Sequence, residues 1–152
     1  IIDWTPDGSD AKSRNLYPEF LSFVKKNISD LEALGHTVEL AGIFYHLGEN
    51  DMSLSSFKQN AVSRMKELID GSRQDLGMRD LKWFVSQQPP AAFDGAAKVD
   101  IASQLSEWSQ QSKSNWHVPA PGLLADKEHI LMNSNGVIKL GLLLADTYLK
   151  QR

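Results

Sequence analysis

Segments with helical periodicity alternate with short apolar segments along the 152 residues, and this order constrains the fold more than any other feature. Residues 17–34 place large apolar side chains three and four positions apart and stop before Gly35, as an amphipathic helix does. The segment 38–46 that follows predicts a buried strand. A second helix is expected from Ser55 or Ser56 to near Gly71, and a second strand at residues 81–86, which the prolines of QQPP close.

The second half of the chain continues the alternation. Residues 96–111 predict a third helix, residues 116–118 a short third strand, and residues 133–148 a last helix capped by Asn133 or Ser134. Such an order predicts the α/β class, with a parallel sheet and helices on both of its faces. The length favours a single domain over residues 1–152. The inward faces of the last two helices are predicted to carry Val99, Ala102, Leu105, Trp108, Val137, Leu140, Leu144 and Tyr148.

Composition excludes several classes of partner and cofactor. The net charge is −3 and lysines and arginines do not cluster, so the chain lacks the electrostatic signature of a protein that binds nucleic acid or an anionic membrane. No apolar stretch reaches the roughly 18 to 20 residues of a membrane span, and no signal peptide is recognisable. The absence of cysteine rules out disulfides and thiolate zinc sites. The absence of cysteine does not identify the compartment, and a secreted or periplasmic location is slightly favoured. No cofactor is expected.

The segment GIFYHLGENDM at residues 42–52 is the first candidate site. An apolar strand ends there at Gly48 and is followed by Glu49, Asn50 and Asp51. In open α/β sheets, ligands bind in the crevice outside the carboxyl ends of the strands, so this placement indicates a site. An ordinary exit from a strand into a loop is the alternative interpretation.

The second candidate is Asp126-Lys127-Glu128-His129 in the last long loop. One turn of chain brings the carboxylate of Asp126 and the imidazole of His129 to the same side. A carboxylate bonded to one ring nitrogen fixes the histidine tautomer and leaves the other nitrogen to accept a proton from a nucleophile. A pair of solvated surface side chains is the competing interpretation.

Together these motifs resemble a known family. The pattern GxND at residues 48–51 followed by DxxH at residues 126–129 resembles the third and fifth blocks of the SGNH (GDSL-like) hydrolases. The whole chain is similar to their sialic-acid-specific acetylesterase-like branch, the carbohydrate esterases of family six. Further similar segments are DWTPDG at 3–8, NLYPEF at 15–20, LKWFVSQQPP at 81–90 and the sequence 126–149.

The resemblance implies a flavodoxin-like, three-layer α/β/α fold and an ester hydrolase that removes acetyl groups from carbohydrates through a serine. It assigns His129 as general base and Asp126 as its orienter. Asn50, with Gly48, would stabilise the tetrahedral oxyanion. The substrate would be an acetylated carbohydrate or another small ester. Supporting roles in holding the loop fall to two acidic residues, Glu49 and Asp51.

Two positions depart from the family pattern. Leu47 replaces a glutamine and Tyr45 a tryptophan, and the first block, Gly-Gln-Ser-Asn or Gly-Asp-Ser, does not occur in the 152 residues. Ser9 lies after the point where that block belongs. We therefore expect these residues to be the C-terminal portion of the hydrolase, with the nucleophile and the N-terminal strands before Ile1, or in a separate chain.

Two other functions stay open at this stage. The first is a carbohydrate-binding protein that keeps the fold without activity. The second is a metal-assisted hydrolase using His46 with Glu49 and Asp51, although these residues lack an obvious fourth ligand. Among the remaining candidates, His117 is expected to be structural and His36 solvated, Trp83 and Trp108 to face the core, and Trp4 and Trp116 to be available to a sugar.

Overall fold

The computed structural model describes residues 1–8, 15–48, 51–52, 55–88, 99–123 and 132–151. They form two compact units, one of residues 1–42 and 63–81 and one of residues 43–62 and 82–152. Each unit is treated by itself below. The single domain expected over residues 1–152 stays a prediction.

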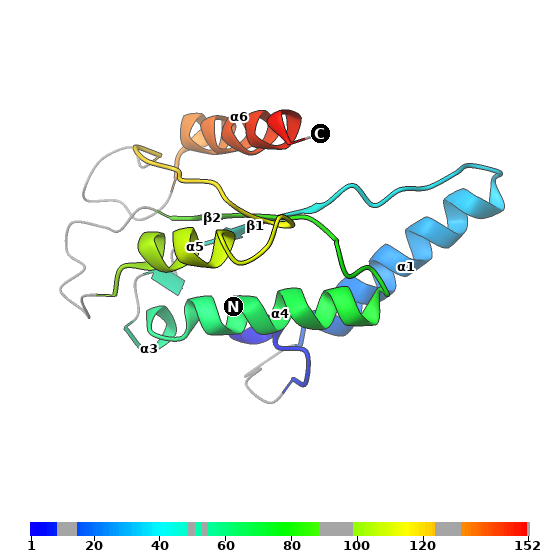
Figure 1. Ribbon diagram of the computed structural model, residues 1–152, viewed down its shortest axis with the longest axis horizontal. Coiled ribbons are helices and arrows are strands. Elements are labelled where there is room, and N and C mark those ends of the chain that lie inside the picture. The colour runs from blue at the N-terminus through cyan, green and yellow to red at the C-terminus, as the bar shows by residue number, and fades with distance from the viewer. Residues whose placement is uncertain (9–14, 49–50, 53–54, 89–98, 124–131, 152) are drawn as a thin grey trace. The chain divides into compact units, whose positions relative to one another are not determined.

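Helix α1 of the first unit spans Tyr17–Ala33 (Figure 1). It ends where Gly35 adopts a φ of 86°, a left-handed conformation that side chains with a Cβ disfavour. The N–H of His36 then donates to the carbonyl of Leu31 at 3.1 Å, which satisfies one of the last helical acceptors. The predicted helix and its glycine stop are confirmed.

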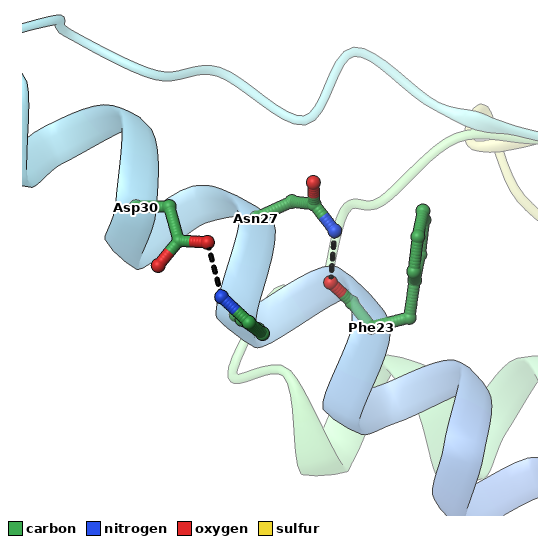
Figure 2. Close-up of polar contacts among 4 residues, drawn as sticks. Phe23, Asn27 and Asp30 are labelled. Carbon is green, nitrogen blue, oxygen red and sulfur yellow. Dashed lines mark hydrogen bonds and ion pairs between the residues drawn. The ribbon is translucent and has the colours of Figure 1, made fainter.

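Two contacts on the exposed side of α1 join residues one turn apart. Figure 2 shows the Asn27 amide donating to the Phe23 carbonyl oxygen, at 2.8 Å, and the Lys26 ammonium paired with Asp30. The Phe23 side chain is 69% exposed. The apolar spacing that predicted this helix therefore includes side chains that are not buried, namely Phe23, Leu31 and Leu34.

Several contacts of Tyr17 and Trp4 hold the first unit together. The Tyr17 hydroxyl donates to Asp75 at 2.7 Å. Burial, and then the hydrogen bond to Asp75, raise the pKa of Tyr17 above its usual range. Trp4 ends a short 3-10 helix, Ile2–Trp4, and meets Phe20 edge-on at 6.2 Å between ring centroids. Residues distant in the sequence thus meet around the start of α1.

The predicted second helix is two helices, α3 at Ser55–Lys58 and α4 at Ala61–Asp75. The prediction that it ends near Gly71 is wrong, because α4 continues to Asp75 and the stop is Gly77, with a φ of 67°. Gly71 instead allows α4 to pack closely against Pro6. A Cβ there would lie 2.8 Å from the Pro6 ring.

Three parallel strands in the order β1-β2-β3 form the sheet of the second unit. They span Ile43–Leu47, Trp83–Gln87 and Asn115–His117. The first strand begins five residues later than the predicted Val38, because its ladder to β2 starts with the Ile43 N–H donating to Lys82 at 2.8 Å. On its other side, β1 pairs with no strand of the described part of the chain.

Helices α5, at Ile101–Ser109, and α6, at Ser134–Lys150, lie on opposite sides of this sheet (Figure 1). Tyr148 of α6 meets the fully buried Phe84 of β2 at 5.8 Å between ring centroids. Helices therefore cover both faces of a parallel sheet, and the predicted α/β class with its three layers is confirmed. No helix among the described residues is long and apolar enough to cross a membrane.

Side-chain caps fix where α5 and α6 begin. Asp100 accepts the N–H of Ser103 at 3.0 Å, so α5 starts at Ile101 rather than at residue 96. Asn133 accepts the N–H of Gly136 at 2.9 Å, which confirms the predicted cap of α6.

The predicted inward faces of these helices need two corrections. Ala102 is exposed, because the buried side of α5 runs through Ile101, Leu105 and Trp108. Val137 is 55% exposed, because the neighbouring Gly136 faces the backbone of Leu123 so closely that a Cβ there would overlap the Leu123 carbonyl oxygen.

Candidate active site at the carboxyl edge of the sheet

Two of the six predicted site residues belong to the described part of the chain, Gly48 and Asp51. The proposed base His129, its orienter Asp126, the oxyanion donor Asn50 and the supporting Glu49 lie outside the described residues. Their roles stay predictions. The structure does describe the strand exit at Gly48 and the surroundings of Asp51.

The strand exit at Gly48 is held by backbone hydrogen bonds on both sides. The N–H of Gln88 donates to the carbonyl of Leu47 at 2.7 Å and so extends the β1–β2 ladder beyond the end of β2. The N–H of Met52 donates to the carbonyl of Gly48 at 3.2 Å. These two bonds hold the backbone at Leu47, Gly48 and Met52.

Asp51 is buried, with 7% of its surface exposed. Its negative charge acts on Tyr45, and burial first, then that charge, raise the pKa of Tyr45 well above its usual value near 10. The Tyr45 hydroxyl consequently stays protonated throughout the range in which an esterase would work. The supporting role predicted for Asp51 stays a prediction.

His46 has hydrogen-bond partners at both ring nitrogens. Nδ1 lies 2.7 Å from Ser86 Oγ and Nε2 lies 3.3 Å from Gln88 Oε1. Within the described residues, no three His, Cys, Asp or Glu side chains gather into a potential metal site. Neutral oxygens at both nitrogens of His46 fit a packed histidine better than a metal ligand.

The second histidine at this edge is His117, on β3. Its Nε2 lies 2.9 Å from Oε1 of Gln87. Burial lowers the pKa of His117 below its ordinary value of 6.5, so the neutral imidazole is favoured in the folded protein. These features fit the structural role predicted for His117.

Three residues at this edge were not singled out from the sequence, Ser86, Gln87 and Gln88. Ser86 and Gln88 are buried and contact His46, and Gln87 contacts His117. A signal was available. The strand LKWFV ends in SQQ just as the preceding strand ends in GEND, and neighbouring parallel strands end at the same edge of a sheet.

The departures and the tryptophans are placed as follows. Leu47, at the position of the family glutamine, is fully buried and lies opposite Gln87 in the register of β1 and β2. Trp83 and Trp108 are buried in the core, as predicted. Trp116 stacks on Phe84 with ring centroids 6.3 Å apart. Its availability to a sugar stays a prediction.

A parallel sheet with helices on both faces and hydrogen-bonded polar side chains at its strand ends places the chain in the α/β class. The family model described as "Carbohydrate esterase, sialic acid-specific acetylesterase" matches residues 1–150, and the chain belongs to this family. The resemblance noted from the sequence is thereby confirmed. Comparison with curated proteins and with solved structures found no match. Membership of the family implies carbohydrate acetylesterase activity in general.

Proposed function

We propose that this protein is a serine ester hydrolase that removes O-acetyl groups from carbohydrates. The family match over residues 1–150 is the observation that carries the proposal. The fixed exit of β1 at Gly48 supports it, because an oxyanion site needs donors that are already in place before the reaction.

The proposed reaction uses the predicted residues in defined roles. A serine hydroxyl attacks the acetyl carbonyl carbon while His129, oriented by Asp126, takes the hydroxyl proton. Asn50 and Gly48 stabilise the negative oxygen of the tetrahedral intermediate. The intermediate collapses to an acetyl-enzyme and the sugar hydroxyl, which leaves with the proton from His129. Water, deprotonated by His129, then attacks the acetyl carbon. The bond from that carbon to the serine oxygen breaks, the serine oxygen takes the proton back from His129, and acetate leaves.

The nucleophilic serine is proposed to come from sequence outside the 152 residues. Support for this part is the absence of a Gly-Asp-Ser or Gly-Gln-Ser block from the sequence, although the third and fifth blocks are present. Joining the natural N-terminal sequence to these residues should give a competent esterase. The 152 residues alone should hydrolyse p-nitrophenyl acetate no faster than a surface histidine does.

The test is release of acetate from an O-acetylated sugar by the full-length protein, followed by proton NMR. The proposal predicts catalytic release that a chelator does not abolish. Binding of the acetylated sugar without release of acetate would favour an inactive binding protein. Activity that a chelator removes and added metal restores would favour a metal-assisted hydrolase.

A further inference from the structure

A network of three side chains joins the ends of β1 and β2 on one face of the sheet. Ser86 Oγ lies 2.7 Å from His46 Nδ1, and His46 Nε2 lies 3.3 Å from Gln88 Oε1. Ser86 has no exposed surface and Gln88 has 2%. Burying a polar side chain to this degree costs free energy unless its hydrogen bonds are satisfied. We therefore interpret the three side chains as one hydrogen-bonded network.

The chemistry of the partners fixes the direction of each hydrogen bond. An amide oxygen only accepts, so His46 must carry a proton on Nε2 and donate it to Gln88. When the ring is neutral, Nδ1 is then an acceptor, and the Ser86 hydroxyl donates to it. The network therefore specifies a single tautomer of His46.

A serine 2.7 Å from an imidazole could also be a nucleophile and its base. Burial argues against this interpretation, because no ester can reach the fully buried Ser86 oxygen. The network lacks access to substrate and must act through another part of the structure.

That part is the exit of β1 at Gly48. Gln88 holds β1 twice, through its side chain at His46 and through its N–H, which donates to the Leu47 carbonyl at 2.7 Å. Leu47 immediately precedes Gly48, whose carbonyl accepts the N–H of Met52. A shift of Gln88 would consequently move the start of the loop.

We propose that His46, linked to Ser86 and Gln88, is a positioning residue for Gly48 at the exit of β1, and this inference rests on the proposed function. Removing the network should leave the substrate contacts in place but loosen Gly48, a proposed oxyanion donor at the end of β1. Because a displacement of about 1 Å at a reacting centre costs about 100-fold in rate, kcat should fall while KM changes little.

The experiment compares kcat and KM of the full-length protein with those of three variants. His46→Leu removes both hydrogen bonds and should lower kcat about 10- to 100-fold. His46→Gln keeps a donor and an acceptor and should recover most of that loss. His117→Leu is the matched control, a half-buried histidine at the same edge, and should leave kcat unchanged.

Two further measurements keep the inference open to refutation. If His46→Leu does not fold, Ser86→Ala removes a single buried oxygen and should still lower kcat with KM unchanged. In the wild type, ¹H–¹⁵N correlation NMR should show the His46 proton on Nε2, and an Nδ1–H tautomer would overturn the network.

The outcomes separate the two proposals. A wild-type protein without esterase activity overturns the proposed function and this inference with it. An active wild type whose His46→Leu variant folds and keeps its kcat, or whose His46→Gln variant is no better than His46→Leu, overturns the positioning role alone.

Discussion

The two faces of the sheet are built alike near the start of the strands and differently near their carboxyl ends. On one face, Phe84 meets Phe44 and Trp116, and farther along the strands His46 is bonded at both nitrogens. On the other face, Trp83 and Val85 are buried, and farther along His117 has a contact to Gln87. The aromatic and aliphatic rows stabilise the sheet. The polar side chains near the carboxyl ends of the strands are the candidates for a functional role.

The two histidines at this edge also differ in their surroundings. His46 has a partner at each ring nitrogen, Ser86 of β2 and Gln88 just beyond it, whereas burial lowers the pKa of His117 and favours its neutral form. Because side chains alternate between the faces of a strand, consecutive residues of β2 and its extension serve both histidines, Ser86 and Gln88 on one face and Gln87 on the other.

The largest expected effect is a loss of stability. It tests whether the apolar side chains on the two faces of the sheet contribute equally to the free energy of unfolding. Phe84→Ala and Trp83→Ala each truncate a buried aromatic side chain, and each should lower the free energy of unfolding by about 3–5 kcal/mol. Phe44→Ala is the control, since Phe44 is 47% exposed and should cost clearly less. Urea denaturation measures all three. A loss at Trp83 much smaller than at Phe84 would show that one face dominates.

A smaller effect concerns how α6 covers the face that carries Phe84. Gly136→Ala would force a Cβ against the Leu123 carbonyl oxygen and should destabilise the protein by about 1–3 kcal/mol. Gly141→Ala is the matched control in the same helix, with open space around its Cβ. It should instead stabilise by about 0.5–1 kcal/mol, because alanine favours a helix. Equal effects of the two variants in thermal unfolding would contradict this docking of α6.

Loss of the cap of α6 should have an effect of about 1 kcal/mol. Asn133→Ala leaves the N–H of Gly136 without its side-chain acceptor, whereas Asn133→Asp or Asn133→Ser retains one. Unfolding curves of the three variants should therefore place alanine below the other two. No difference among them would mean that the cap contributes nothing to stability.

The smallest expected effect is a pH dependence specific to the face with His117. Its pKa is lowered in the folded protein, so below about pH 6.5 the unfolded chain binds more protons and stability falls as the pH falls. Above that range the contribution is constant. His117→Gln should flatten part of the decline between pH 7 and pH 5 in urea denaturation, and exchanging the exposed His36 for glutamine is the control. An unchanged decline would contradict the burial of a neutral His117.

The sequence predicted those parts of the fold that local chemistry determines. The spacing of apolar residues, the Gly35 stop and the Asn133 cap located α1 and α6 to within a few residues. Gly71 misled because its role depends on Pro6, a neighbour that is distant in the sequence. The start of β1 was missed for a similar reason, since a strand begins where its partner begins.

For the candidate site, the sequence predicted residues whose roles stay predictions, and it missed the contacts among the described polar side chains at the strand ends. Gly48 and Asp51 follow β1 at the carboxyl edge of the sheet, and the site predicted there stays a prediction. The contacts of His46 with Ser86 and Gln88 could not be read from the sequence, because the register of two parallel strands decides which side chains meet.

The most direct test of the central claim, a serine esterase at this edge of the sheet, is the rate of acetyl ester hydrolysis by the full-length protein and its His129→Ala variant. The variant should lose activity on the order of a thousandfold or more, because triad members act as a unit. Asn50→Ala should lose about 10²- to 10³-fold, the scale of a single oxyanion donor. A folded His129→Ala variant that hydrolyses the ester as fast as the wild type would contradict the account.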